Sequence, residues 1–226
     1  FIWAMPKELL TAGRTTTILT YKSEGSVLSS YLKKLEVPVE VANDNRLEEA
    51  FRKKAAELIT IKDIPALSRL SLSHSGQLDS MSNSNDCRTI VNALKNLRGR
   101  QLKDVPAENI LITCAKDGWY KKGNVNVAGP FASGSKLFQR ANWVPKITRG
   151  TNNYAHCSHL IYLYDQYMNP LVIRWLEEDK GAFEDEYALT ELIQWVWRSR
   201  VRRGQPITLY LPNPRMRQLM EEWLSD

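Results

Sequence analysis

Stretches typical of buried strands alternate with stretches typical of amphipathic helices along this chain, and this alternation restricts its fold more than any other feature. β-branched and aromatic runs predict strands, and apolar residues at helical spacing predict helices. Strands are predicted over 15–23, 37–43, 108–120, 159–166 and 206–213. Helices are predicted over 25–36, 45–61, 86–100, 169–180, 184–204 and 214–224. Alternation of this kind is typical of a parallel sheet flanked by helices, so we expect an α/β fold.

The organisation of the chain favours one α/β domain over residues 1–226. Internal repeats and low-complexity linkers are absent from the sequence. The segment 65–85 is rich in serine and has no firm period, so a loop or insertion is predicted there. The first residue is Phe1, in an apolar stretch, which favours a piece of a longer polypeptide, although a processed terminus would start the same way.

Charge and cysteine content narrow the class of protein. The formal net charge is +6 and the isoelectric point is about 9.2, which favours polyanionic partners. The chain has three widely spaced cysteines, Cys87, Cys114 and Cys157, so we expect no disulfide framework. A reducing cytoplasm is the expected location. No apolar run is long enough to cross a membrane. His156, Cys157 and His159 suggest zinc, but no second ligand pair has suitable spacing, so no metal site is predicted.

The predicted helix over 184–204 begins with three acidic residues and ends in arginines and a glycine. This order matches the helix dipole and C-capping rules, which explain part of the charge. Gln194, Arg198 and Arg202 stand at positions i, i+4 and i+8 and therefore share one row on a continuous helix. Guanidinium groups donate paired hydrogen bonds to phosphate oxygens, and a glutamine can orient an attacking water. The alternative is an exposed basic helix end that binds phosphate backbones or solvent.

The run "QWVWRSRVRR" over 194–203 resembles the sixth motif of superfamily-two helicases, whose pattern is roughly Q-x-x-G-R-x-x-R. Gln194 and Arg198 match the first two key positions. Trp197 stands in place of the glycine and Val201 in place of the second arginine, so Arg202 comes one residue late. The whole tail from residue 185 is similar to helicase-like proteins of bacterial viruses. The resemblance implies that Arg198 and Arg202 are arginine fingers and that Gln194 positions a phosphate or water.

Three further segments resemble helicase motifs and occur in the family's order. The stretch "KITRGTNNY" over 146–154 is similar to the fifth motif, and glycine there lets backbone approach a phosphate, although an ordinary β-turn would also fit. Segment 15–32 is similar to the fourth motif, and the strand at 109–119 resembles one that places a threonine on nucleic acid. The resemblance assigns nucleotide contact to Gly150 and Asn152. It assigns contact with nucleic acid to Thr20, Tyr21, Lys22, Thr113, Thr148 and Arg149.

Two signatures of a complete motor are missing from the chain. The sequence contains no G-x-x-x-x-G-K-[ST] phosphate loop and no D-E-x-[DH] magnesium box. The family carries both on its first motor domain. The chain is therefore identified as a second, C-terminal RecA-like domain, and the resemblance implies that the missing N-terminal domain holds ATP and Mg²⁺. Implied partners are that domain and nucleic acid, DNA rather than RNA, in phage replication within a bacterial or infected cell.

Three other classes of function fit parts of the sequence. A non-enzymatic nucleic-acid-binding module would use the same basic residues without any nucleotide effect. Half of a packaging or assembly ATPase would use the arginines between subunits. A nuclease would need a cluster of carboxylates or a His/Cys dyad, and the sequence offers none that converges. An ATP-dependent helicase or translocase is the enzyme expected of the whole protein, and this segment alone is expected to hydrolyse little ATP.

Overall fold

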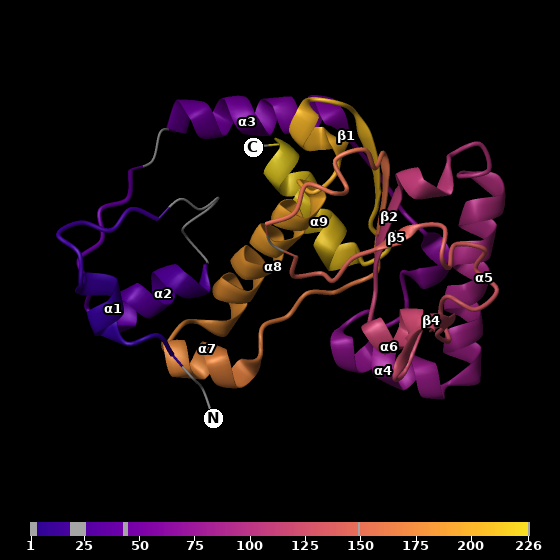
Figure 1. Cartoon of the computed structure of the whole chain (residues 1–226), viewed down its shortest axis with the longest axis horizontal. Coiled ribbons are helices and arrows are strands. Elements are labelled where there is room, and N and C mark those ends of the chain that lie inside the picture. The colour runs from indigo at the N-terminus through magenta and orange to yellow at the C-terminus, as the bar shows by residue number, and fades with distance from the viewer. Residues whose placement is uncertain (1–3, 19–25, 43–44, 149, 226) are drawn as a thin grey trace. The chain divides into compact units, whose positions relative to one another are not determined.

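A computed structural model of the chain describes residues 4–18, 26–42, 45–148 and 150–225 (Figure 1). The chain forms two compact units, one of residues 1–45 and 167–190 and the other of residues 46–166 and 191–226. The sequence predicts one domain over 1–226, whereas strands occur in the second unit alone among the described residues. No helix of the described ranges is long and apolar enough to cross a membrane.

The first unit contains short helices around a small apolar cluster. Its elements are α1 (Lys7–Thr11), α2 (Val27–Lys34), α7 (Pro170–Leu176) and most of α8 (Lys180–Val196). Tyr31 stacks on Trp175 with ring centroids 5.5 Å apart, and Lys34 pairs with Glu177. Asn169 caps α7, and Pro170 at its first position is already fixed in a helical φ. The predicted helices at 25–36 and 169–180 are thus confirmed.

The second unit is built on a five-stranded parallel sheet in the order β1-β7-β6-β2-β5. The strands are β1 (Ile59–Lys62), β2 (Ile110–Thr113), β5 (Asn142–Trp143), β6 (His159–Tyr162) and β7 (Ile207–Tyr210). Its helices are α3 (Asn45–Leu58), α4 (His74–Ser82), α5 (Ser84–Arg100), α6 (Lys116–Trp119) and α9 (Pro214–Ser225). Short 3-10 turns cover Pro65–Leu67 (η1), Ala107–Asn109 (η2) and Arg200–Arg203 (η3). The predicted α/β fold with a mainly parallel sheet is confirmed.

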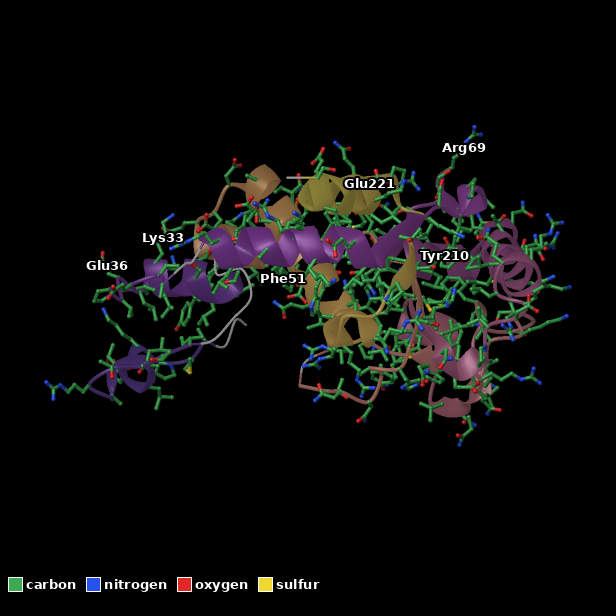
Figure 2. The ribbon with its side chains drawn as sticks, turned by 90° about the horizontal axis from the view of Figure 1, so that it is seen from above. Lys33, Glu36, Phe51, Arg69, Tyr210 and Glu221 are labelled. Atoms are coloured by element: carbon green, nitrogen blue, oxygen red, sulfur yellow. The ribbon has the colours of Figure 1, made fainter. Side chains whose placement is uncertain are left out.

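Helices cover both faces of this sheet because each strand buries alternate side chains on opposite faces. Ile110, Ile112 and Ile161 pack with the apolar face of α5 in one core cluster. On the other face Tyr162 packs edge-on against Trp195 of α8 at 5.2 Å. Figure 1 shows α5 on one side of the strands and α9 on the other. Figure 2 shows α3 alongside α9, where Phe51 contacts Trp223.

Some sequence-based expectations about elements were wrong. Residues 15–18 and 37–42 form no strand, and Val39 and Val41 are exposed, because no neighbouring strand pairs with them in the described residues. The expected helix over 45–61 ends at Leu58, and its last residues open β1, which pairs with β7. The serine-rich segment 65–85, predicted as a loop or insertion, is irregular only over 68–73 and at Asn83. Elsewhere it is helical: Ser73 caps α4 by accepting from the Gly76 amide, and Asn83 caps α5.

A two-stranded antiparallel hairpin leaves the sheet between β2 and β5. It consists of β3 (Tyr120–Lys121) and β4 (Asn124–Ala128). Tyr120 packs edge-on against Trp143 of β5 with centroids 5.2 Å apart, so the base of the hairpin is fixed to the edge of the sheet. Figure 1 shows β4 beside α6.

Candidate functional site

The loop between β5 and β6 lies against the end of α8 and the turn that follows it. Arg198 donates from its guanidinium to the Thr151 carbonyl oxygen at 3.5 Å. Arg202 donates to the side-chain oxygen of Asn152. The structure therefore brings together two segments, at 150–152 and 198–202, that the sequence assigns to nucleotide contact.

The turn that carries these arginines is set by a serine and a buried valine. α8 ends at Val196, and Ser199 donates to the Val196 carbonyl at 2.7 Å while accepting from the Val201 amide. Val201 is buried, whereas Arg202 and Arg203 on the same 3-10 turn are exposed. Gly204 closes the turn at φ 70°, a left-handed conformation that glycine adopts without steric cost.

The expected geometry of this segment was partly wrong. The sequence predicts one helix to residue 204, with Gln194, Arg198 and Arg202 in a single row. Because the helix ends at Val196, Gln194 lies in its last turn and the two arginines follow it on separate turns. Arg198 and Arg202 still meet at one place, since both bind the same loop.

The loop itself is held by its own short-range contacts. Thr148 donates to the Pro145 carbonyl at 2.6 Å, and the Thr151 hydroxyl accepts from the Asn153 amide at 3.3 Å. Gly150 is exposed and has φ 66°, and a Cβ built there would meet no atom within 4 Å. The backbone at Gly150 is therefore accessible to a ligand. Its positive φ is a conformation that glycine adopts without steric cost. Arg149 lies outside the described residues.

The arginine turn lies at the amino edge of the sheet. The Arg200 amide donates to the Cys157 carbonyl at 3.2 Å, two residues before β6 begins. Burial lowers the pKa of His159 at the start of β6, and the positive charges of Arg200 and Lys62 lower it further. Of these two charges Arg200 lies at the amino edge, whereas Lys62 is the last residue of β1 and lies toward the opposite end of the strands. Both disfavour an added proton on His159.

The carboxyl edge of the sheet is organised differently. The connection leaving β2 leads to β5 on one side, and the connection leaving β6 leads to β7 on the other, so β2 and β6 flank a topological switch point. Ligands of open α/β sheets usually bind there. Here Gln77 of α4 fills the position: its amide donates to Leu163 O at 2.7 Å and accepts from Ala115 N at 2.8 Å. Gln77 is 1% exposed.

Three further charged groups at the carboxyl edge have a charged or aromatic partner. Arg217 of α9 pairs with Asp63 after β1 at 2.6 Å, and Arg215 pairs with Asp165 after β6 at 2.8 Å. Lys146 after β5 places its ammonium 4.6 Å from the centre of the Tyr164 ring. Burial lowers the pKa of Lys146, and the negative charge of Glu191 opposes that shift.

The remaining predicted contact residues are not part of the arginine site. Thr113 ends β2 and is fully buried, and its hydroxyl has no hydrogen-bond partner among the described residues. A direct contact of Thr113 with nucleic acid would therefore require the strand end to open. Thr20, Tyr21 and Lys22 lie outside the described residues.

The histidine and cysteine group does not form a metal centre. His156 approaches the Glu108 carbonyl at 3.0 Å, and the Cys157 thiol lies 3.5 Å from the Asn142 amide. Burial raises the pKa of Cys157 to about 12, although the Asn142 contact opposes the rise, so its thiol is not an activated nucleophile. Within the described ranges, no three His, Cys, Asp or Glu side chains are placed to hold a metal ion.

Comparisons with known proteins identify the larger unit. The family model described as the YonV C-terminal Rossmann-like domain matches residues 53–224. The SPbeta prophage-derived uncharacterized protein YonV of Bacillus subtilis (strain 168) is 41% identical over 80 residues, which are 34% of this chain and 19% of that protein. The match thus spans about a fifth of the relative's length. No solved structure matches the chain.

Proposed function

The chain belongs to the family of YonV C-terminal Rossmann-like domains, and we propose that it is the second motor domain of an ATP-dependent nucleic-acid helicase or translocase. In this proposal another domain binds ATP and Mg²⁺, and this domain supplies arginines to the phosphates. The observation that carries the proposal is that Arg198 and Arg202, far from the 150–152 segment in sequence, both hydrogen-bond to it.

The chemistry of the arginine turn suits a phosphate supplied from outside the domain. Arg202 is exposed, and the side chain it contacts, Asn152, is a neutral amide that leaves the guanidinium charge uncancelled. Phosphoryl transfer spreads negative charge over oxygens, and a guanidinium binds two of them at once while staying charged. The exposed backbone at Gly150 adds a place where phosphate oxygens can approach the loop closely.

The closed carboxyl edge supports a role as the completing half of a shared site. Gln77 fills the switch point where an α/β sheet would hold its own ligand. A nucleotide held by a second domain and contacted by the arginine turn needs no such space. Contacts that form when ATP is bound and are lost on hydrolysis would move the two domains relative to each other, and this movement would drive translocation.

The role of Arg198 is tested by ATP turnover in the full-length protein that contains this chain. Arg198→Ala is expected to lower turnover by about 10³- to 10⁵-fold, the range measured for arginine fingers. Arg203→Ala is the matched control, since Arg203 is exposed on the same turn and makes no described contact with the loop. Turnover near the wild-type rate in Arg198→Ala, with nucleic-acid binding retained, would remove the finger role and favour a domain that binds nucleic acid without taking part in hydrolysis.

A further inference from the structure

The segment 116–140, which contains α6, the β3–β4 hairpin and the turns that follow it, has an excess of basic over acidic residues. Residues 116–140 contain five basic residues and one acidic residue, which gives a net charge of +4 against +6 for the whole chain. All five basic side chains are exposed, and they are Lys116, Lys121, Lys122, Lys136 and Arg140. A concentration of exposed positive charge within one short segment favours a polyanionic partner.

The base of the hairpin is rigid. Phe138 packs against Trp119 and Tyr120 with ring centroids 6.3 and 6.0 Å away. The Gly129 amide donates to the Trp119 carbonyl at 2.8 Å, and a Cβ at Gly129 would come within 2.6 Å of the Gly118 carbonyl oxygen. The two chain segments therefore meet backbone to backbone, and this close contact fixes the direction in which the hairpin projects.

The outer half of the hairpin is exposed on both faces. Val125 is 56% exposed and Val127 is 41% exposed. Exposed valines add little to the stability of a two-stranded hairpin, which is marginal in water. Gly123, at φ 79°, lies in the turn, and the two lysines at 121 and 122 precede it. The Gln139 side chain donates to the Asn126 carbonyl at 3.0 Å and supports the outer strand. The hairpin is thus a supported two-stranded ribbon with lysines near its tip and apolar side chains on its flank.

We infer that this ribbon is a contact site for duplex DNA, lying in the major groove. The major groove of B-form DNA is about 12 Å wide and admits a two-stranded β-ribbon, whereas the major groove of A-form RNA is too narrow to be entered. Lysines near the tip would pair with phosphates on the groove walls. Val125 and Val127 would contact apolar base edges such as thymine methyl groups. This site names duplex DNA as the nucleic acid that the proposed motor domain binds. It rests on the proposed function, because that proposal is the reason to expect DNA as the partner.

The contact is tested by duplex-DNA binding in the absence of nucleotide, measured by fluorescence anisotropy over a series of salt concentrations. Lys121→Ala/Lys122→Ala is expected to weaken binding about ten-fold or more and to reduce the slope of log affinity against log salt by about 2. The matched control is Lys53→Ala/Lys54→Ala, an exposed lysine pair on α3 that removes the same charge. The control is expected to bind within about two-fold of wild type.

Each other outcome overturns the inference. Equal losses of DNA affinity in both double variants would mean that binding depends on the overall charge of the protein alone. Unchanged binding in the hairpin variant, or no duplex binding by the wild type, would remove the site. A larger loss for single-stranded DNA or for duplex RNA would place a different ligand on the ribbon. None of these measurements contains ATP, so the arginine proposal and the ribbon can fail independently.

Discussion

The two edges of the parallel sheet use their polar side chains in opposite ways. At the carboxyl edge Gln77 joins the ends of β2 and β6, and Asp63 and Asp165 are paired with arginines of α9. At the amino edge Arg202 contacts a neutral amide, and the His159 pKa is lowered partly by nearby positive charge. The two carboxylates and the backbone groups bound by Gln77 are therefore paired inside the domain at the carboxyl edge, where the Thr113 hydroxyl has no partner among the described residues. At the amino edge the charge of Arg202 is exposed.

This difference shows that the topology of a sheet does not by itself locate a ligand. The carboxyl edge of a parallel sheet is the usual place to search, and the switch point lies between β2 and β6. In this domain a buried amide already occupies that place. The exposed charge lies on the turn before β7 and on the β3–β4 hairpin, and a phosphate-bearing partner is expected there.

The largest effect is expected from opening the carboxyl edge. Gln77→Leu leaves the Ala115 amide and the Leu163 carbonyl buried without their partner, because a leucine of similar size offers no hydrogen bond. We expect the free energy of unfolding to fall by about 2–5 kcal/mol, as two buried backbone groups lose their hydrogen bonds. Denaturant unfolding followed by circular dichroism measures the change.

The control for this variant is Gln218→Leu on the exposed surface of α9, where the side chain pairs with Glu222. We expect its unfolding free energy to stay within about 0.5 kcal/mol of wild type. If Gln77→Leu cost no more than this control, Gln77 would not be closing the carboxyl edge, and the contrast between the edges would be lost.

A smaller effect is expected at the amino edge. The positive charge of Arg200 contributes to the lowered pKa of His159, so Arg200→Gln should raise that pKa toward its ordinary value. Because the pKa of His159 in the folded state lies below that of the unfolded chain, the unfolded state binds the proton more readily. Stability from this group is therefore present above the unfolded pKa and is lost as pH falls through the folded pKa.

Nuclear magnetic resonance titration of the histidine ring protons measures this shift. Arg203→Gln removes the same charge from an exposed arginine of the same turn and should leave the His159 pKa closer to the wild-type value, since Arg203 is not among the causes of the shift. A His159 pKa unchanged in Arg200→Gln would mean that burial and Lys62 set it, and Arg200 would lose its assigned contribution.

The sequence predicted the core strands better than the peripheral ones. The strands at 110–113, 159–162 and 207–210 each have three apolar or aromatic residues out of four, as expected for strands buried on both faces. Residues 15–18 and 37–42 have the same β-branched composition but no strand partner, and composition cannot supply one. Sequence periodicity predicts the end of a helix at residues 59–61, where β1 begins. The strand forms because it pairs with β7, about 150 positions away, and local periodicity does not contain that pairing.

The candidate site was predictable in its residues but not in its geometry. Their spacing predicts Arg198 and Arg202 as site residues on one continuous helix. The helix ends at Val196 instead, where the Ser199 hydroxyl donates to the Val196 carbonyl. Gln77 lies in a serine-rich stretch without periodicity, so its local hydrogen bond to Leu72 and its two bonds to the ends of β6 and β2 left no signal in sequence. The lysines of the hairpin could have been found from the "YKKGNVNV" pattern of alternating residues around a glycine turn.

The affinity of the full-length protein for DNA with and without a non-hydrolysable ATP analogue tests the central claim most directly. If the arginine turn senses a nucleotide held by another domain, the analogue should change DNA affinity by about 5- to 150-fold, and Arg198→Ala should abolish that change. Wild-type DNA affinity that is identical with and without the analogue would contradict a motor role for this domain.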